Sequence, residues 1–160
     1  TYTMFFDNGP TPERSELAAL QGEVLMRRAK FTWEDGFFLN PIWETSYVVM
    51  DENVLKFYKD EQYYSNFPLK PIFKFVLKKN HHLLPTKRKD YSSDPSKTIE
   101  LEYLTIVKNM FERSFPVLKV AVLSPDSSGL LASIREHIDV AYLHLGRQPL
   151  RIGGARRRDY

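Results

Sequence analysis

A β-hairpin signature near the middle of the chain constrains the fold more than any other feature. Trp43 to Met50 and Val54 to Lys59 are two runs rich in aromatic and branched apolar residues. The polar triplet Asp51-Glu52-Asn53 separates them, and these residue types tolerate the backbone angles of a tight turn. The pattern predicts two antiparallel strands, over roughly residues 42–50 and 54–59.

The rest of the chain predicts further strands and two helices. The expected elements are a short helix over residues 11–21, a strand over 23–28, a long loop over 29–41, a loop over 60–69, a strand over 71–79, a mobile insertion over 80–97, one or two strands over 98–108, a strand over 115–123 and an amphipathic helix from 124 to about 145. The last helix is predicted by apolar residues that recur at helical spacing. Strands followed by a closing helix favour an α+β fold with an antiparallel sheet.

The composition argues against several classes of function. There is no cysteine, which excludes disulfides, thiol catalysis and thiolate metal sites. The net charge is only +3, so we expect no nucleic-acid partner. The chain has no phosphate-binding glycine loop, serine-hydrolase motif or zinc-binding histidine motif, so we expect no enzymatic activity, no metal and no cofactor.

Three short matches in the chain resemble a known domain family. They are Gly22-x-Val24, Trp43-x-x-x-Tyr47-Val-Val-Met50 and Leu55-x-Phe57-Tyr58-Lys59-Asp60. On these residues the chain resembles a pleckstrin-homology (PH) domain over residues 22–146. The resemblance implies a PH-like bent antiparallel β-barrel of about seven strands, open at one end and capped by a C-terminal α-helix. Residues 1–21 would form an N-terminal extension with a short helix, and residues 147–160 a flexible basic tail.

The chain departs from the PH pattern where phosphoinositides usually bind. In phosphoinositide-binding members, basic residues late in the first strand and in the second strand hold the phosphates. Here those positions carry Met26, Glu44 and Ser46, and a carboxylate repels a polyphosphate. A simple anionic lipid, phosphatidic acid above all, therefore fits better. In length and leading helix the chain is similar to a divergent group of apicomplexan PH domains, the phosphatidic-acid-sensing acylated PH proteins and the PH module of the glideosome-associated connector.

The loop expected after the first strand combines cations with bulky apolar residues, which is typical of insertion at a membrane interface. We expect the lipid head group to be bound by Arg27, Arg28, Lys30, Lys74, Lys78 and Lys79. We expect the membrane to be entered by Phe31, Trp33, Phe37, Phe38 and Leu39. The run Lys87-Arg88-Lys89 is interpreted as a solvated loop.

Strand alternation adds an expectation about direction. Val24, Met26 and Arg28 should lie on one face of the first strand, and Leu25 and Arg27 on the other. Arg28 would then reach the open mouth of the barrel.

Two alternatives stay open at this point. Some of the aromatic residues of the loop can pack back onto the barrel or onto the N-terminal helix. The chain can also be a PH-like scaffold for protein–protein interaction that has lost lipid binding, which Glu44 and Ser46 would equally fit. The preferred hypothesis is a monomeric cytoplasmic protein that binds peripherally to an anionic phospholipid membrane, with a protein partner as the second hypothesis.

Overall fold

Antiparallel strands and two helices make up the described part of the chain. The computed structural model describes residues 19–34, 36–91 and 99–152, and the side chains of Phe37, Tyr91 and residues 147–152 lie outside that description. The elements are β1 (Leu20–Thr32), β2 (Gly36–Leu39), β3 (Glu44–Asp51), β4 (Val54–Tyr58), α2 (Glu61–Asn66), β5 (Phe73–Val76), β6 (His81–Leu83), β7 (Lys87–Tyr91), β8 (Ile99–Met110), β9 (Arg113–Leu123) and α3 (Leu130–Ile152). The fold is α+β, as expected.

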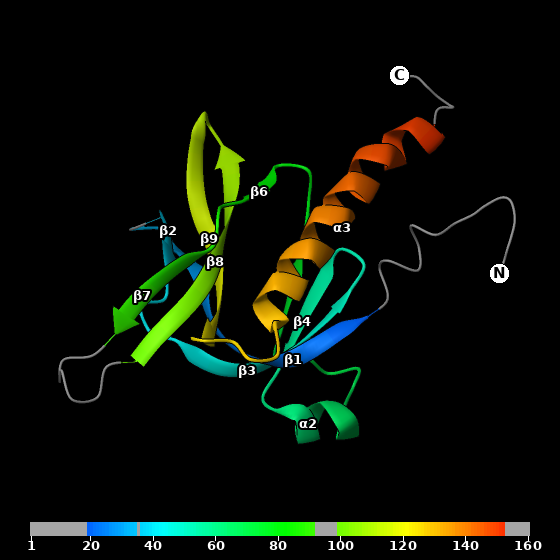
Figure 1. The fold of residues 1–160 in the computed structure, drawn as a ribbon. Coiled ribbons are helices and arrows are strands. Elements are labelled where there is room, and N and C mark those ends of the chain that lie inside the picture. The colour runs from blue at the N-terminus through cyan, green and yellow to red at the C-terminus, as the bar shows by residue number, and fades with distance from the viewer. Residues whose placement is uncertain (1–18, 35, 92–98, 153–160) are drawn as a thin grey trace, which may run out of the picture.

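The strands form one bent sheet with the order β5-β4-β3-β1-β9-β8-β6, while β2 pairs with β1 and β7 with β8. The outer strands of this order, β5 and β6, do not pair with each other, so the sheet is not closed. β1 joins its two halves, because residues 20–26 pair with β3 and residues 25–28 pair with β9. In Figure 1, β8 and β9 cross β1 and β3 at a steep angle. This arrangement is compatible with a PH-like fold.

The predicted hairpin is confirmed, but the predicted number of strands is too low. β3 and β4 pair from Tyr47 with Tyr58 to Asp51 with Val54, and Glu52 takes a left-handed backbone angle (φ 53°) in the turn. The described part of the chain has nine strands in place of about seven. The extra strands come from two segments expected to be irregular, residues 29–41 and 80–97.

The long loop expected over residues 29–41 is largely a second hairpin. β1 continues to Thr32 and pairs with β2, from Ala29 with Leu39 to Thr32 with Gly36. Gly36 has a positive φ of 75° at the turn, a conformation that glycine adopts without strain. Similarly, β6 and β7 both pair with β8, so residues 81–91 of the expected mobile insertion are largely part of the sheet. Pairing with a distant strand leaves no signal in the local sequence, so these short strands could not be predicted.

Two further expectations about local structure are wrong. Residues 60–69 contain α2, whose first turn is capped by Asp60: its Oδ1 accepts a hydrogen bond from the Tyr63 N–H at 2.7 Å. An aspartate cap followed by a glutamate is a helix signal that the sequence analysis did not use. The expected N-terminal helix falls mostly on residues 1–18, outside the described residues, and its last two residues, Leu20 and Gln21, belong to β1.

The C-terminal helix covers the core and one end of the sheet. Its apolar side chains at helical spacing are buried, as predicted, and they are Leu131, Ile134, Ile138, Ala141 and Leu145. Burial of each larger one contributes roughly 1.5–3 kcal/mol. His137 Nε2 lies 3.0 Å from the carbonyl oxygen of Glu52, which ties α3 to the β3–β4 turn. The helix runs beyond Gly146 to Ile152, so the expected tail boundary at residue 147 is not a helix end.

Candidate functional site

The β1–β2 hairpin presents large apolar side chains to solvent. Trp33, at its tip, is 94% exposed, and Phe31 is 48% exposed. Their rings meet edge to face with centroids 5.2 Å apart, so they form one projecting aromatic unit. Phe38 is 38% exposed and Leu39 is partly buried. Phe37 pairs with Phe31 through the backbone, and its side chain lies outside the description.

A second hairpin extends from the same end of the sheet and also exposes an aromatic ring. Phe111 forms the β8–β9 turn and is 84% exposed. Because Arg28 pairs with Leu118, and Met110 pairs with Arg113, this turn lies beyond the same end of the sheet as Trp33. Figure 1 shows both hairpins on the side away from α3. Phe111 was not among the residues expected from the sequence to enter the membrane, and the strand register identifies it.

Arg28 lies near the start of β3 and against Phe73 of β5, at the end of the bent sheet that we call its mouth, and it is paired with an acid. Its Nε lies 3.9 Å from Glu44 Oε1, and its guanidinium carbon lies 5.0 Å from the centre of the Phe73 ring. Glu44, the acidic residue singled out in the sequence, is therefore in contact with Arg28. Ser46, another departure from the PH pattern, is buried and donates its hydroxyl to the Tyr58 carbonyl at 3.1 Å.

Arg27 points away from Arg28, as strand alternation predicts. Its Nε donates to the Asn40 carbonyl at 2.6 Å, and its guanidinium carbon lies 5.5 Å from the centre of the Trp43 ring. Its direct neighbour on β9 is Lys119. The Lys119 ammonium in turn lies 5.0 Å from the centre of the Tyr103 ring.

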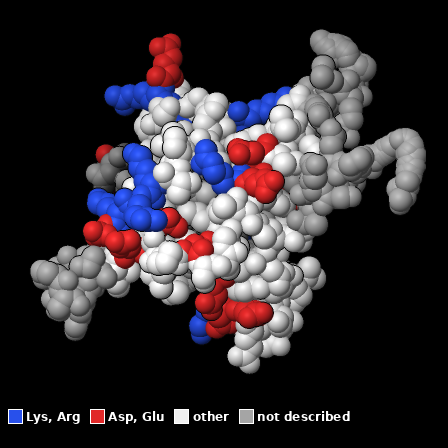
Figure 2. Space-filling view, in the orientation of Figure 1, with Lys and Arg blue, Asp and Glu red and all other residues white. Residues whose placement is uncertain are grey.

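Lys119 is close enough to three other cations of this outer face for their charges to act on it. Burial lowers its pKa, and so, in decreasing order, do the positive charges of Arg27, Lys89 and Lys87. The two lysines are on β7, and Lys87 pairs with Tyr103 of β8. We call Arg27, Lys87, Lys89 and Lys119 the outer basic cluster. In Figure 2 a large group of blue atoms covers the side of the molecule where Figure 1 labels β2 and β7.

Of this cluster, only Arg27 was expected from the sequence to bind a head group. Lys87 and Lys89 were expected in a solvated loop, and Lys119 was not predicted to have a role. The period-two spacing of the two β7 lysines is the only signal in the sequence, since it places both on the same face of a strand.

The other expected head-group residues do not join one cluster. Lys30 is exposed and pairs with Phe38 in the β1–β2 hairpin. Lys74 is exposed on β5 opposite Lys56. Lys78 and Lys79 follow β5 beside the β3–β4 turn, where the Leu77 N–H donates to the Asn53 carbonyl. They are separated from Arg28 by the length of β3, about 25 Å.

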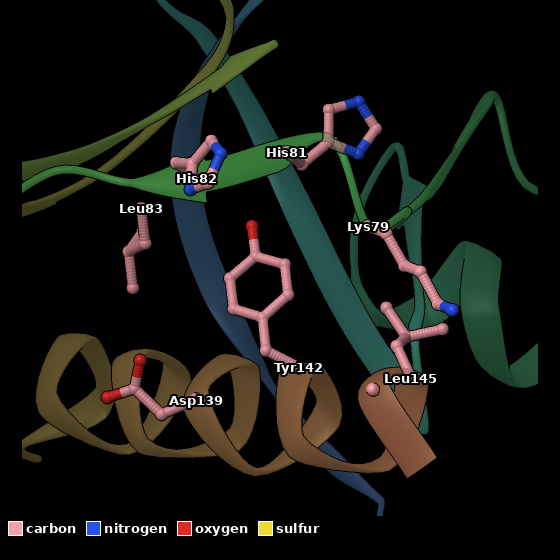
Figure 3. Close-up of a pocket in the computed structure, with 8 residues that line it drawn as sticks. Lys79, His81, His82, Leu83, Asp139, Tyr142 and Leu145 are labelled. Atoms are coloured by element: carbon pink, nitrogen blue, oxygen red, sulfur yellow. The ribbon is translucent and has the colours of Figure 1, made fainter. Parts of the chain in front are cut away.

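A cavity of about 480 Å³ lies between β6 and α3. Figure 3 shows the Tyr142 hydroxyl pointing from α3 toward β6, with His82 on the facing strand. That hydroxyl is buried and makes no hydrogen bond among the described residues. Burial, followed by the Asp139 carboxylate, raises the pKa of Tyr142 to about 12, so it is a neutral hydrogen-bond donor. The cavity contains no residue expected to bind lipid except Lys79.

Among the described residues, no group of three or more histidine or acidic side chains is placed to hold a metal ion. Within the same part of the chain, no helix is both long and apolar enough to cross a membrane.

No protein-family model matches this chain, and no curated protein matches it.

Proposed function

We propose that this chain is a PH-like module that docks on anionic phospholipid membranes by inserting the β1–β2 hairpin. The bent antiparallel sheet with its C-terminal helix supports the PH-like assignment. The observation that carries the membrane proposal is Trp33, which is 94% exposed at the hairpin tip and is held by Phe31. Such an exposed aromatic pair is unfavourable in water and well suited to the membrane interface.

Neighbouring groups support a membrane rather than an isolated exposed ring. Phe111 projects at the same end of the sheet, so two hairpins can enter the interface together. Lys30 is exposed one residue before Phe31, and a cation near an anionic surface contributes about 1 kcal/mol. Docking at this end leaves α3 on the side away from the lipid (Figure 1).

The mouth of the sheet favours simple anionic lipids over polyphosphoinositides. Glu44 already compensates Arg28 at 3.9 Å, and its carboxylate would repel a cluster of phosphates in the same place. Phosphatidic acid carries a single phosphomonoester on the glycerol, so it can approach through inserted apolar side chains and scattered cations without entering the mouth. We therefore propose phosphatidic acid as the favoured lipid.

A vesicle panel tests this proposal. Vesicles containing phosphatidic acid, phosphatidylserine or a polyphosphoinositide are compared by sedimentation at matched surface charge and at two salt concentrations. We expect the strongest binding to phosphatidic acid, with weaker binding at high salt. Equal binding to all three would contradict the preference, and no binding to any of them would contradict membrane docking.

Glu44→Gln tests the role assigned to the mouth. Removal of the carboxylate leaves Arg28 uncompensated, so binding to polyphosphoinositide vesicles should rise by about threefold to tenfold, as expected for one partly exposed ion pair. Binding to phosphatidic acid should change less. The matched control is Glu102→Gln, which removes the partner of Arg88, 2.8 Å away on β7. An equal response of both variants would show a simple change in net charge.

A protein-interaction scaffold is the second candidate. The segment between β4 and β5 exposes apolar side chains of its own: Leu69 is 90% exposed, and Phe67 and Ile72 are each 48% exposed. Apolar surface of this kind also suits a protein partner. Failure of every vesicle in the panel would favour this candidate.

A further inference from the structure

We propose that the outer basic cluster is a binding site for a phosphomonoester dianion, separate from the Arg28–Glu44 pair in the mouth of the sheet. The site is assembled from β1, β7 and β9, on the face opposite to the core. The proposal stands on the geometry of this face and does not depend on insertion of the β1–β2 hairpin. It assigns a role to Lys87, Lys89 and Lys119.

The strand register brings the four cations within reach of one another. Arg27 and Lys119 are direct cross-strand neighbours, with β-carbons about 5 Å apart. Thr105 of β8 pairs with Lys119, and Tyr103, two residues earlier, pairs with Lys87. Successive rows on one face are about 7 Å apart. Lys89, opposite Leu101, lies one row beyond Lys87, and the charges of both lysines still reach Lys119. Lysine and arginine side chains are long, so the four cations can surround an anion bound between them.

In β7 and β8 the acidic side chains Asp90, Glu100 and Glu102 lie on the face opposite to Lys87 and Lys89. Arg88 forms its 2.8 Å ion pair with Glu102, and these two residues alternate with Lys87, Lys89 and Tyr103 along their strands. The charged neighbours that shift the pKa of Lys119 are all cations. Like charges on adjacent strands are destabilising, so a bound anion would relieve repulsion already present in the fold.

The aromatic residues beneath the cluster hold the cations in place. Trp43 and Tyr103 meet edge to face with centroids 6.1 Å apart. Arg27 lies over the first ring and Lys119 over the second, and each such cation–π contact contributes about 0.5–1 kcal/mol at an exposed site. The Arg27 Nε bond to the Asn40 carbonyl further fixes the guanidinium. Its terminal amino groups make no hydrogen bond within the described residues, and they suit two phosphate oxygens.

A dianionic phosphomonoester fits this arrangement better than a monoanion. Arg27 offers a planar pair of donors, and three lysine ammonium groups surround it as point charges. Two negative charges gain about twice as much as one from these cations. A carboxylate or a phosphodiester lacks the third anionic oxygen that the separate lysines would contact. The ligand class is therefore a terminal phosphate, whether free, on a soluble metabolite or on a lipid.

Amide NMR titration of the whole chain with inorganic phosphate, at constant ionic strength, tests the site. We expect saturable shifts at residues 27, 87, 103 and 119, and smaller changes in an equal titration with acetate. Lys119→Gln should weaken phosphate binding about tenfold, the effect of one charge-assisted hydrogen bond. Lys70→Gln removes an exposed lysine of the segment between β4 and β5 and should leave binding unchanged. Scattered, unsaturable shifts, or equal effects of the two variants, would overturn the site.

Two further arms identify the source of the phosphate. If Lys119→Gln also loses the preference for phosphatidic acid over phosphatidylglycerol vesicles at matched charge, the lipid head group occupies the site. If Lys119→Gln loses binding to glycerol 3-phosphate but still prefers phosphatidic acid over phosphatidylglycerol vesicles, the ligand is a soluble phosphomonoester. Both results support the site. Vesicle binding by the parent chain without any response to soluble phosphate would overturn this inference and leave the membrane proposal standing.

Discussion

Trp33→Ala is expected to weaken binding to phosphatidic acid vesicles by about tenfold or more. The indole is 94% exposed in the free protein, so nearly all of its surface is available for transfer to the membrane. Burial of about half of a tryptophan surface, on the order of 100 Å², would contribute roughly 2 kcal/mol. Quantitative vesicle sedimentation at constant lipid composition measures the change.

The control for this variant is another exposed apolar residue away from the hairpins. Leu143 is 61% exposed on α3, and Leu143→Ala should leave vesicle binding unchanged. Both variants should unfold at nearly the parent temperature, because neither side chain is in the core. If Trp33→Ala binds vesicles as tightly as the parent, the β1–β2 hairpin is not the inserting element.

Acid is expected to destabilise the fold by roughly 2 to 3 kcal/mol between pH 7 and pH 4 because of His81. Its side chain is buried, its Nδ1 accepts a hydrogen bond from the Lys78 N–H at 2.9 Å, and its ring lies 5.1 Å from Phe75. Burial first, and then the charges of Lys108, Lys78 and His82, lower its pKa to about 4. The folded state therefore holds this imidazole neutral.

The direction of the effect follows from proton linkage. Between the usual pKa of about 6.5 and the lowered value, the unfolded chain binds a proton that the folded chain does not. Stability due to His81 is thus fully present above about pH 6.5 and is lost as the pH falls toward 4. Burial acts to raise the pKa of Asp126, but hydrogen bonds donated to its carboxylate by the Leu131 N–H, by Ser128 and by the Leu130 N–H together outweigh burial and lower it. Its contribution is lost only below about pH 4.

Urea unfolding at pH 7, 6, 5 and 4 measures this loss. His81→Gln cannot be protonated, so it should flatten the pH dependence between pH 6.5 and 4 whatever its effect on stability at pH 7. His82→Gln changes the adjacent, exposed residue and should keep most of the slope. A slope that survives in His81→Gln would show that other groups cause the acid sensitivity.

The hairpin and the last helix could be predicted because their signals are local. Strong alternation around a polar turn defined β3 and β4, and apolar residues at helical spacing defined α3. β2, β6 and β7 could not be predicted in this way. Each is short and pairs with a long neighbour, so its conformation depends on hydrogen bonds to a partner rather than on its own residues.

In the candidate site, too, local features could be predicted from the sequence and contacts between distant strands could not. Alternation in β1 by itself determined that Arg27 and Arg28 point to opposite faces, since successive residues of any strand do so. The sequence also showed an acid, Glu44, at a position where the resemblance to PH domains leads one to expect a cation. It could not determine which distant charges would meet. Only the pairing of β7 with β8, β8 with β9 and β9 with β1 places Lys87 and Lys119 on the same face as Arg27, because register between strands is decided by the packing of the whole sheet.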